Sequence, residues 1–146
     1  MDILTPEQRF RNMSRVRSTN TKPEKQVRSL LHGMGYRFRL HAKDLPGSPD
    51  IVLPKYRAVI FVHGCFWHRH PGCKYASTPA THKEFWTAKF EQNKARDRRV
   101  IKLLREKNWN VIIVWQCELR DIAALITKLE ANLRGRNMES SVKDSI

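Results

Sequence analysis

Residues 58–73 read AVIFVHGCFWHRHPGC, and this stretch predicts both the fold and the place of the chemistry. Its first half, Ala58 to Val62, is an apolar, β-branched run of the kind that fits a buried strand. Its second half, His63 to Cys73, contains three histidines, two cysteines and an adjacent Phe-Trp pair. A hydrophobic core does not need that mixture. We therefore expect a buried strand that ends in a loop carrying chemistry.

The composition predicts a basic, single-domain protein that binds a polyanion. The chain has 146 residues and a formal net charge of +14, from 28 Lys and Arg against 14 Asp and Glu. One domain, residues 1–134, is the simplest organisation, with a polar tail at 135–146 that we expect to be disordered. No apolar run approaches the roughly 20 residues of a membrane span, and no signal peptide is evident, so we expect a cytoplasmic protein. Nucleic acid is favoured over a merely solvated basic surface or an anionic membrane.

The hydrophobic periodicity predicts an α/β fold in which helices flank a mixed β-sheet. Thr-x-x-Glu or Thr-x-x-Gln capping boxes mark three helix starts, at Thr5, Thr21 and Thr81. The link between the second and third strands is so short that these strands must be antiparallel. The expected helices are at about 6–16, 22–33, 82–107 and 120–133, and the expected strands are at 36–41, 50–53, 57–62 and 109–115.

Three cysteines cannot all pair within one chain, and in a reducing compartment we expect metal ligands or inert buried thiols. Cys65, His70, Cys73 and Cys117 can supply a tetrahedral zinc set of three thiolates and one imidazole. Cys117 follows the strand at 109–115, which could lie beside Ala58 to Val62, so the ligands would converge at two strand ends. Four protein ligands leave no open position, so the zinc would be structural. The alternative is that Cys117 is a small buried hydrophobe and the others are loop residues.

A nuclease needs a carboxylate to hold Mg²⁺ against the scissile phosphate, and Asp50 at a strand start is the candidate. His63, at the end of the neighbouring strand, could face the same phosphate. His68 could act as the general base, because an imidazole titrates near working pH, and Asp97 could orient it. Glu24 could support the metals from a helix start.

Each of these residues also has a plain structural reading. Pro-Asp is a common turn sequence, Asp97 could be an i,i+4 surface partner, and Glu24 already has a role in a capping box. The remaining histidines show no convergent neighbours in the sequence, and we expect them to be structural or solvated: His32, His41 and His82.

Two adjacent aromatics, Phe66 and Trp67, lie between a zinc ligand and the candidate base. Such a pair is most often a satellite core under a loop. In a protein of this charge, the pair could instead insert between base steps, joined by Trp86 from the helix that follows. Unstacking costs least where pairing is already poor, so insertion would favour mismatches.

These residues together resemble the very short patch repair (Vsr) DNA mismatch endonuclease family, from about Asn12 to Leu133. The VIFVHGCFWH run at 59–68 is highly specific. The other matching segments are Glu24-Lys25, LPGSPD at 45–50, EFW at 84–86, NKARDRR at 93–99 and residues 109–117.

The resemblance implies a restriction-endonuclease-like fold and a Mg²⁺-dependent nick in double-stranded DNA, 5′ of the thymine in a T·G mismatch left by deamination of 5-methylcytosine. It assigns Mg²⁺ to Asp50 and the main-chain carbonyl of Val62, and phosphate and water to His63 and His68, with support from Glu24 and Asp97. It assigns structural zinc to Cys65, His70, Cys73 and Cys117, and DNA intercalation to Phe66, Trp67 and Trp86. A monomer is expected, with mismatch-repair proteins as possible partners.

This chain departs from the family pattern in two places: Val62 stands where Thr is familiar, and the run from His70 to Cys73 has one additional residue. Two alternatives stay open. One is a sequence-specific restriction nuclease that cuts both strands of intact sites. The other is a zinc-stabilised DNA-binding module without chemistry, in which Asp50 has no role.

Overall fold

The computed structural model describes residues 20–134. The helix expected at 6–16, the Thr5 capping box and the tail at 135–146 lie outside the described residues. The described chain forms a four-stranded sheet in the order β1-β2-β3-β4. These strands are β1 (Arg39–Leu40), β2 (Ile51–Leu53), β3 (Ala58–His63) and β4 (Asn110–Trp115).

The sheet is mixed, as the sequence predicted. β2 is antiparallel to both β1 and β3, and β3 is parallel to β4. A single 3-10 turn, Pro54–Tyr56, joins β2 to β3, which confirms that so short a link requires antiparallel strands. The strand expected at 36–41 is shorter than predicted, because Tyr36 and Phe38 pack against the core from outside the ladder.

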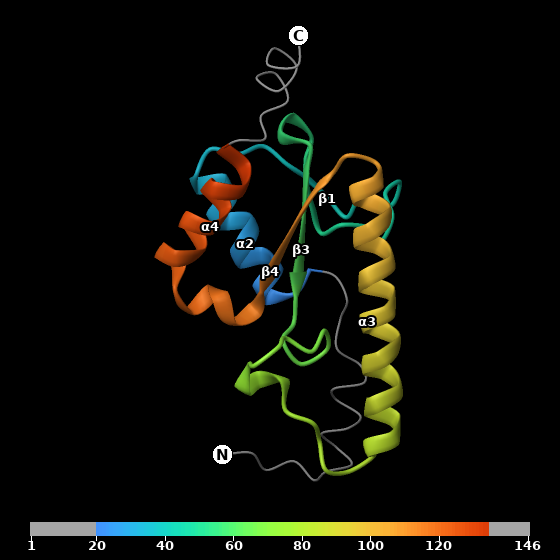
Figure 1. Cartoon of the computed structure of the whole chain (residues 1–146). Helices are drawn as coiled ribbons and strands as arrows, with labels where there is room; N and C mark the ends of the chain where they lie inside the picture. Colours follow the sequence, from blue (N-terminus) through green and yellow to red (C-terminus); the bar gives the residue numbers. More distant parts are fainter. Residues whose placement is uncertain (1–19, 135–146) are drawn as a thin grey trace.

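Within residues 20–134, three helices cover the sheet, which establishes the α/β class. They are α2 (Lys22–Gly33), α3 (Lys83–Glu106) and α4 (Ile122–Arg134). α2 and α4 lie on one side of the sheet, and α3 runs along the other (Figure 1). No helix among residues 20–134 is long and apolar enough to cross a membrane.

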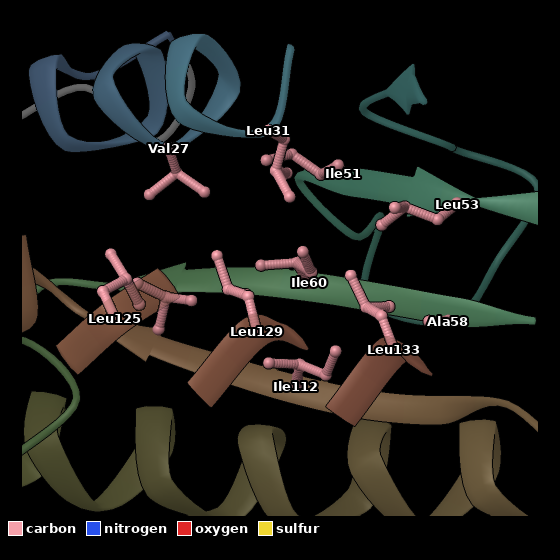
Figure 2. Close-up of a cluster of buried hydrophobic side chains, with 11 residues drawn as sticks. Val27, Leu31, Ile51, Leu53, Ala58, Ile60, Ile112, Leu125, Leu129 and Leu133 are labelled. Carbon is pink, nitrogen blue, oxygen red and sulfur yellow. The ribbon is translucent and has the colours of Figure 1, made fainter. Parts of the chain in front are cut away.

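The face toward α2 and α4 holds an aliphatic core. Figure 2 shows Val27 and Leu31 of α2 and Leu129 of α4 directed toward Ile60 of β3. Each of these four side chains is fully buried. Complete burial of a side chain of this size stabilises the fold by about 1.5–3 kcal/mol relative to exposure. This core therefore holds α2 and β3 in a fixed relation, which matters because both carry residues of the site.

The helix starts show where local sequence signals succeed and where they fail. Thr21 caps α2 as predicted, since its Oγ1 accepts a hydrogen bond from the Glu24 N–H (3.3 Å). The prediction of a capping box at Thr81 is wrong. His82 is the N-cap of α3, in a left-handed conformation (φ 55°), and makes no side-chain cap. This extra residue places Thr81 outside the first helical turn, beyond reach of the N–H groups that it was expected to satisfy.

Candidate active site

The polar residues predicted from the sequence gather at one edge of the sheet, beside the end of β3. The reason is strand register. Ile51 pairs with Ile60, so Asp50 continues β2 alongside the last residues of β3. His63 pairs with Trp115 in the parallel ladder, so β3 and β4 leave the sheet at the same level. Cys65 and Cys117 each follow two residues later, and the register thus brings them together.

The first cluster at this edge consists of Glu24, His41 and Asp50, whose ligand atoms all lie within 4.8 Å of one another. Glu24 is 2% exposed. Its Oε2 lies 3.0 Å from His41 Nε2 and accepts hydrogen bonds from Arg28 (3.0 Å) and from the Asn20 N–H (3.1 Å). Two carboxylates beside one imidazole form a site rich in donor atoms for a divalent cation.

The Asp50 carboxylate accepts a hydrogen bond from the Val62 N–H at 2.7 Å. Burial raises the pKa of Asp50 to about 6, while this hydrogen bond opposes the shift, and the negative charge of Glu24 adds to it. A bound cation would offset that cost of a buried charge. Asp50 and Glu24 therefore fit a magnesium ion, and the main chain of Val62 lies at the same point.

The second cluster consists of His63, His68 and Asp97. The two imidazole rings stack at a centroid distance of 3.7 Å and an interplanar angle of 6°. His68 Nδ1 lies 2.6 Å from Asp97 Oδ2, on α3. With Nδ1 donating to the carboxylate, Nε2 of His68 is left to accept a proton, which is the arrangement of an oriented general base.

The charges of this second cluster differ from those of the first. Burial would raise the pKa of Asp97, but the hydrogen bond from His68 and nearby positive charges hold it below its ordinary value. Burial, with the neighbouring charge of His68, lowers the pKa of His63 to about 3, so this ring is neutral at physiological pH. His63 is 6% exposed, and its Nδ1 finds no hydrogen-bond partner. The Nδ1 atom of this neutral ring is therefore available to hydrogen-bond an incoming polar group.

The third cluster contains the four residues that the sequence proposed as zinc ligands: Cys65, His70, Cys73 and Cys117. His70 Nδ1 lies 3.4 Å from Cys117 Sγ, and the His70 ring stacks on Trp115 at 4.2 Å. Burial and the adjacent thiols raise the pKa of Cys65 to about 12. Thiolates held this close need a cation to offset their charge, so three sulfurs and one imidazole fit Zn²⁺.

The aromatics predicted to enter DNA form one packed group in which the rings of Phe66, Trp67 and Trp86 are 5.2–5.3 Å apart. Phe90 joins them, 5.1 Å from Phe66. Trp86 is only 2% exposed, whereas Phe66 and Trp67 are half-buried. The group forms the satellite core that the sequence offered as the alternative, with Phe66 and Trp67 nearest to solvent.

Two polar side chains of α3 hold the loop after β3. Asn93 donates to the Trp67 carbonyl (3.3 Å), and the Asp97 carboxylate lies 2.6 Å from His68 Nδ1. Arg69 adds a further anchor, since its guanidinium lies 4.1 Å from the Phe90 ring centroid and donates to Thr78 Oγ1 (3.0 Å). The sequence analysis missed Arg69.

The sequence showed no convergent neighbours for His41, and the structure corrects this point. The ligand atoms of His41, Glu24 and Asp50 lie within 4.8 Å of one another, and His41 Nε2 is also 3.1 Å from Arg28. The signal was hidden because Glu24 and His41 are 17 residues apart and belong to different elements. A pairing pattern that places residue 41 opposite residue 50 would have found it, since Leu40 pairs with Ile51.

Comparison with known proteins shows the family of the chain. The family model described as DNA mismatch endonuclease Vsr matches residues 1–75, so the likeness begins before Asn12. The chain is 56% identical over 128 residues to the "Type II nicking enzyme V.XorIIP" of Xanthomonas oryzae pv. oryzae, covering 88% of this chain and 93% of that protein. It is 47% identical over 119 residues to the "DNA mismatch endonuclease Vsr" of Escherichia coli, covering 82% and 76%.

A third relative, the "Type II nicking enzyme V.NmeAIP" of Neisseria meningitidis, is 37% identical over 145 residues, 99% of both chains. The basic α/β fold, the carboxylate and imidazole clusters and these matches define a DNA endonuclease, which is a hydrolase. More particularly, the chain belongs to the DNA mismatch endonuclease Vsr family.

Proposed function

We propose that this protein is a mismatch endonuclease with a restriction-endonuclease-like fold. It nicks double-stranded DNA 5′ of the thymine in T·G mismatches that arise from deamination of 5-methylcytosine, in a Mg²⁺-dependent hydrolysis. The observation that supports this most directly is the hydrogen bond from the Val62 N–H to the Asp50 carboxylate. It joins the candidate metal ligand to the strand that ends in His63, so a carboxylate and an imidazole serve one phosphodiester.

In this proposal, the surroundings of each residue indicate its role in the reaction. Asp50, the Val62 carbonyl and Glu24 hold the cation, and Mg²⁺, when bound, stabilises the negative charge that develops on the phosphate. His68 takes the proton of the attacking water at Nε2, while Asp97 holds the ring by Nδ1. Neutral His63 hydrogen-bonds the phosphate from within the buried edge.

The zinc proposal concerns the shape of the loop and not the chemistry. Zn²⁺ on Cys65, His70, Cys73 and Cys117 would join the ends of β3 and β4 and fix the loop that carries His68. Purified protein is expected to contain one equivalent of zinc by elemental analysis. Protein that nicks DNA at full rate with no bound zinc would contradict the assignment.

Mismatch preference comes from the aromatic group. In the proposal, Phe66 and Trp67 enter the duplex beside the T·G pair, and Trp86 supports them from α3. Unstacking costs a few kcal/mol and is least where pairing is poor, so entry at a mismatch is favoured over entry at matched DNA. One such edge on a monomer acts on one strand, which agrees with a nick.

The test is cleavage of a set of duplexes that differ only at one base pair. A T·G duplex is expected to be nicked on the thymine strand when Mg²⁺ is added, while matched T·A and C·G duplexes stay intact on a denaturing gel. Cleavage of both strands of a matched duplex would favour a restriction-type nuclease instead. Binding without any cleavage in Mg²⁺ would favour a DNA-binding module.

A further inference from the structure

We propose that His41 is a metal ligand of the carboxylate site. We also propose that it makes this site prefer a first-row transition ion, such as Mn²⁺, over Mg²⁺. The inference rests on the proposed function, because it concerns the same cation that Asp50 and Glu24 would hold. It goes further in assigning a nitrogen ligand and, with it, the identity of the preferred metal.

The sheet itself builds this third ligand into the site. Leu40 pairs with Ile51, so His41, the residue that follows β1, falls opposite Asp50, the residue that precedes β2. The His41 N–H donates to the Asp50 carbonyl at 3.1 Å, which fixes the backbone of one residue against the other. The imidazole then reaches across to α2, where Glu24 is anchored in the first turn. The residue after β1, the residue before β2 and the first turn of α2 thus supply one metal-ligand side chain each.

The spacing of the donors suits a chelated ion. His41 Nε2 and Glu24 Oε2 are 3.0 Å apart. Two neighbouring ligands of an octahedral ion with bonds of about 2.1 Å are separated by about 3.0 Å, which is the same spacing. The Asp50 carboxylate lies within 4.8 Å of both atoms, so it can occupy a further position around that ion.

A positive group already marks the place where these donors converge. One guanidinium nitrogen of Arg28, Nη2, lies 3.0 Å from Glu24 Oε2 and 3.1 Å from His41 Nε2, and it also donates to Asn20 Oδ1 at 2.9 Å. In the tautomer with the ring proton on Nδ1, Nε2 of His41 accepts from Arg28, and this is the tautomer that metal ligation through Nε2 requires. Arg28 therefore stands in for the ion and competes with it.

The chemistry of the donor set decides the metal. Mg²⁺ is a hard ion that takes oxygen ligands and keeps several waters. Imidazole nitrogen suits the later first-row ions, such as Fe²⁺, Ni²⁺ and Zn²⁺, and affinity for a mixed nitrogen and oxygen site rises along that row from Mn²⁺, which also accepts oxygen ligands. With only Asp50 and Glu24 the site would favour Mg²⁺, and His41 shifts the balance toward the transition ion.

The experiment measures cation binding directly, without DNA and without activity. Mn²⁺ is titrated into the full-length protein and followed by electron paramagnetic resonance, and Mg²⁺ affinity is obtained from displacement of the bound Mn²⁺. His41→Gln is compared with wild type and with His32→Gln, a control at an exposed histidine of the same chain. Melting temperatures establish that each variant is folded, and His41→Asn serves as a second variant.

His41→Gln is expected to weaken Mn²⁺ binding by about tenfold or more. The same change is expected to alter Mg²⁺ binding by less than about twofold, because Mg²⁺ gains little from the nitrogen. The spin-echo modulation of a directly bound ¹⁴N nucleus should be present in wild type and in the His32→Gln control, and absent from both His41 variants. Arg28→Gln should tighten Mn²⁺ binding, and this gain should vanish in the Arg28→Gln, His41→Gln double variant.

An unchanged ratio of Mn²⁺ to Mg²⁺ affinity in folded His41→Gln would overturn the inference, as would ¹⁴N modulation that persists without His41. Asp50→Asn separates this failure from a failure of the proposed function. If Asp50→Asn abolishes binding of both ions while His41→Gln changes nothing, the carboxylate site stands and only the ligand role of His41 is lost. If Asp50→Asn binds both ions normally, the proposed metal site itself is wrong.

Discussion

Two polar centres lie at the same sheet edge and are built from the same residue types, yet their charges are arranged in opposite ways. In the centre of Glu24, His41 and Asp50, burial raises the pKa of Asp50 to about 6. In the centre of His63, His68 and Asp97, the hydrogen bond from His68 and neighbouring positive charges keep the pKa of Asp97 below its ordinary value. One carboxylate lacks sufficient positive charge nearby, and the other is satisfied by its own imidazole.

The difference supports the proposal that the first centre holds a cation and that the second moves a proton. A buried carboxylate with a raised pKa gains most from an added positive ion, so it fits a metal site. A carboxylate already bonded to an imidazole gains little from an ion, but it fixes the ring and its tautomer, which suits a general base. Four substitutions test this difference between the two centres.

The largest effect is expected from Asp50→Asn. Nicking should fall by about 10³-fold or more, because several kcal/mol of transition-state stabilisation depend on the cation. Stability should be unchanged or higher at neutral pH. A carboxyl group whose pKa rises from 3.8 to about 6 on folding costs stability above about pH 6 and none below 3.8. Gel-based nicking and thermal unfolding at pH 7 measure both, and a lower melting temperature with full activity would contradict the comparison.

Asp97→Asn should come next, with nicking reduced by about 10²-fold, since the amide leaves His68 in the wrong orientation or tautomer. Here stability should fall at neutral pH, opposite to Asp50→Asn. A carboxyl group whose pKa is lowered on folding stabilises the fold at pH values above its ordinary pKa. That contribution disappears as the pH falls through the lowered pKa. The difference in melting temperature between wild type and variant should therefore narrow in acid.

Glu24→Gln should reduce nicking by about tenfold, a smaller effect, because Glu24 supports the cation held chiefly by Asp50. Its Oε2 also accepts from Arg28, so the variant should unfold at lower denaturant concentration than wild type. Adding Mg²⁺ should restore part of the rate, because the loss lies in cation affinity. A rate that no Mg²⁺ concentration improves would place Glu24 in the chemical step.

Thr21→Ala should give the smallest effect, a loss of about 1 kcal/mol in the free energy of unfolding, from removal of the α2 cap. The cap also holds the helix turn that presents Glu24, so nicking at low Mg²⁺ should fall slightly. Thr81→Ala is the matched control, because the structure gives the cap position of α3 to His82. Equal destabilisation by the two substitutions would contradict the assigned helix starts.

Much of the fold could be predicted from local patterns. The apolar run before His63 predicted β3, the Thr21 capping box predicted the start of α2, and hydrophobic periodicity predicted a helix at about 82–107, where α3 lies. Where such patterns failed, the deciding conformation was not local in origin. The left-handed residue before α3 depends on how the loop reaches the helix, and a two-residue β1 depends on how Tyr36 and Phe38 pack.

The residue types of the site were also readable from the sequence. Carboxylates, imidazoles and thiols at 24, 50, 63, 68 and 97 and in the Cys/His loop were singled out because such groups are rarely placed together for packing alone. The grouping of these residues into three centres was partly predicted from the sequence, which indicated the zinc set and the pair of His68 and Asp97.

The strands, the principal helices and the types of reactive group could be predicted from short-range periodicity and composition. Which reactive groups lie next to one another depends on the tertiary structure. The parallel register of β3 and β4 brings Cys65 near Cys117. The contact between His41 and Glu24, which are 17 residues apart in the sequence, places His41 beside Glu24 and Asp50. The physical reason is that strand register and helix docking are set by burial of the whole core, which no local pattern of residues encodes.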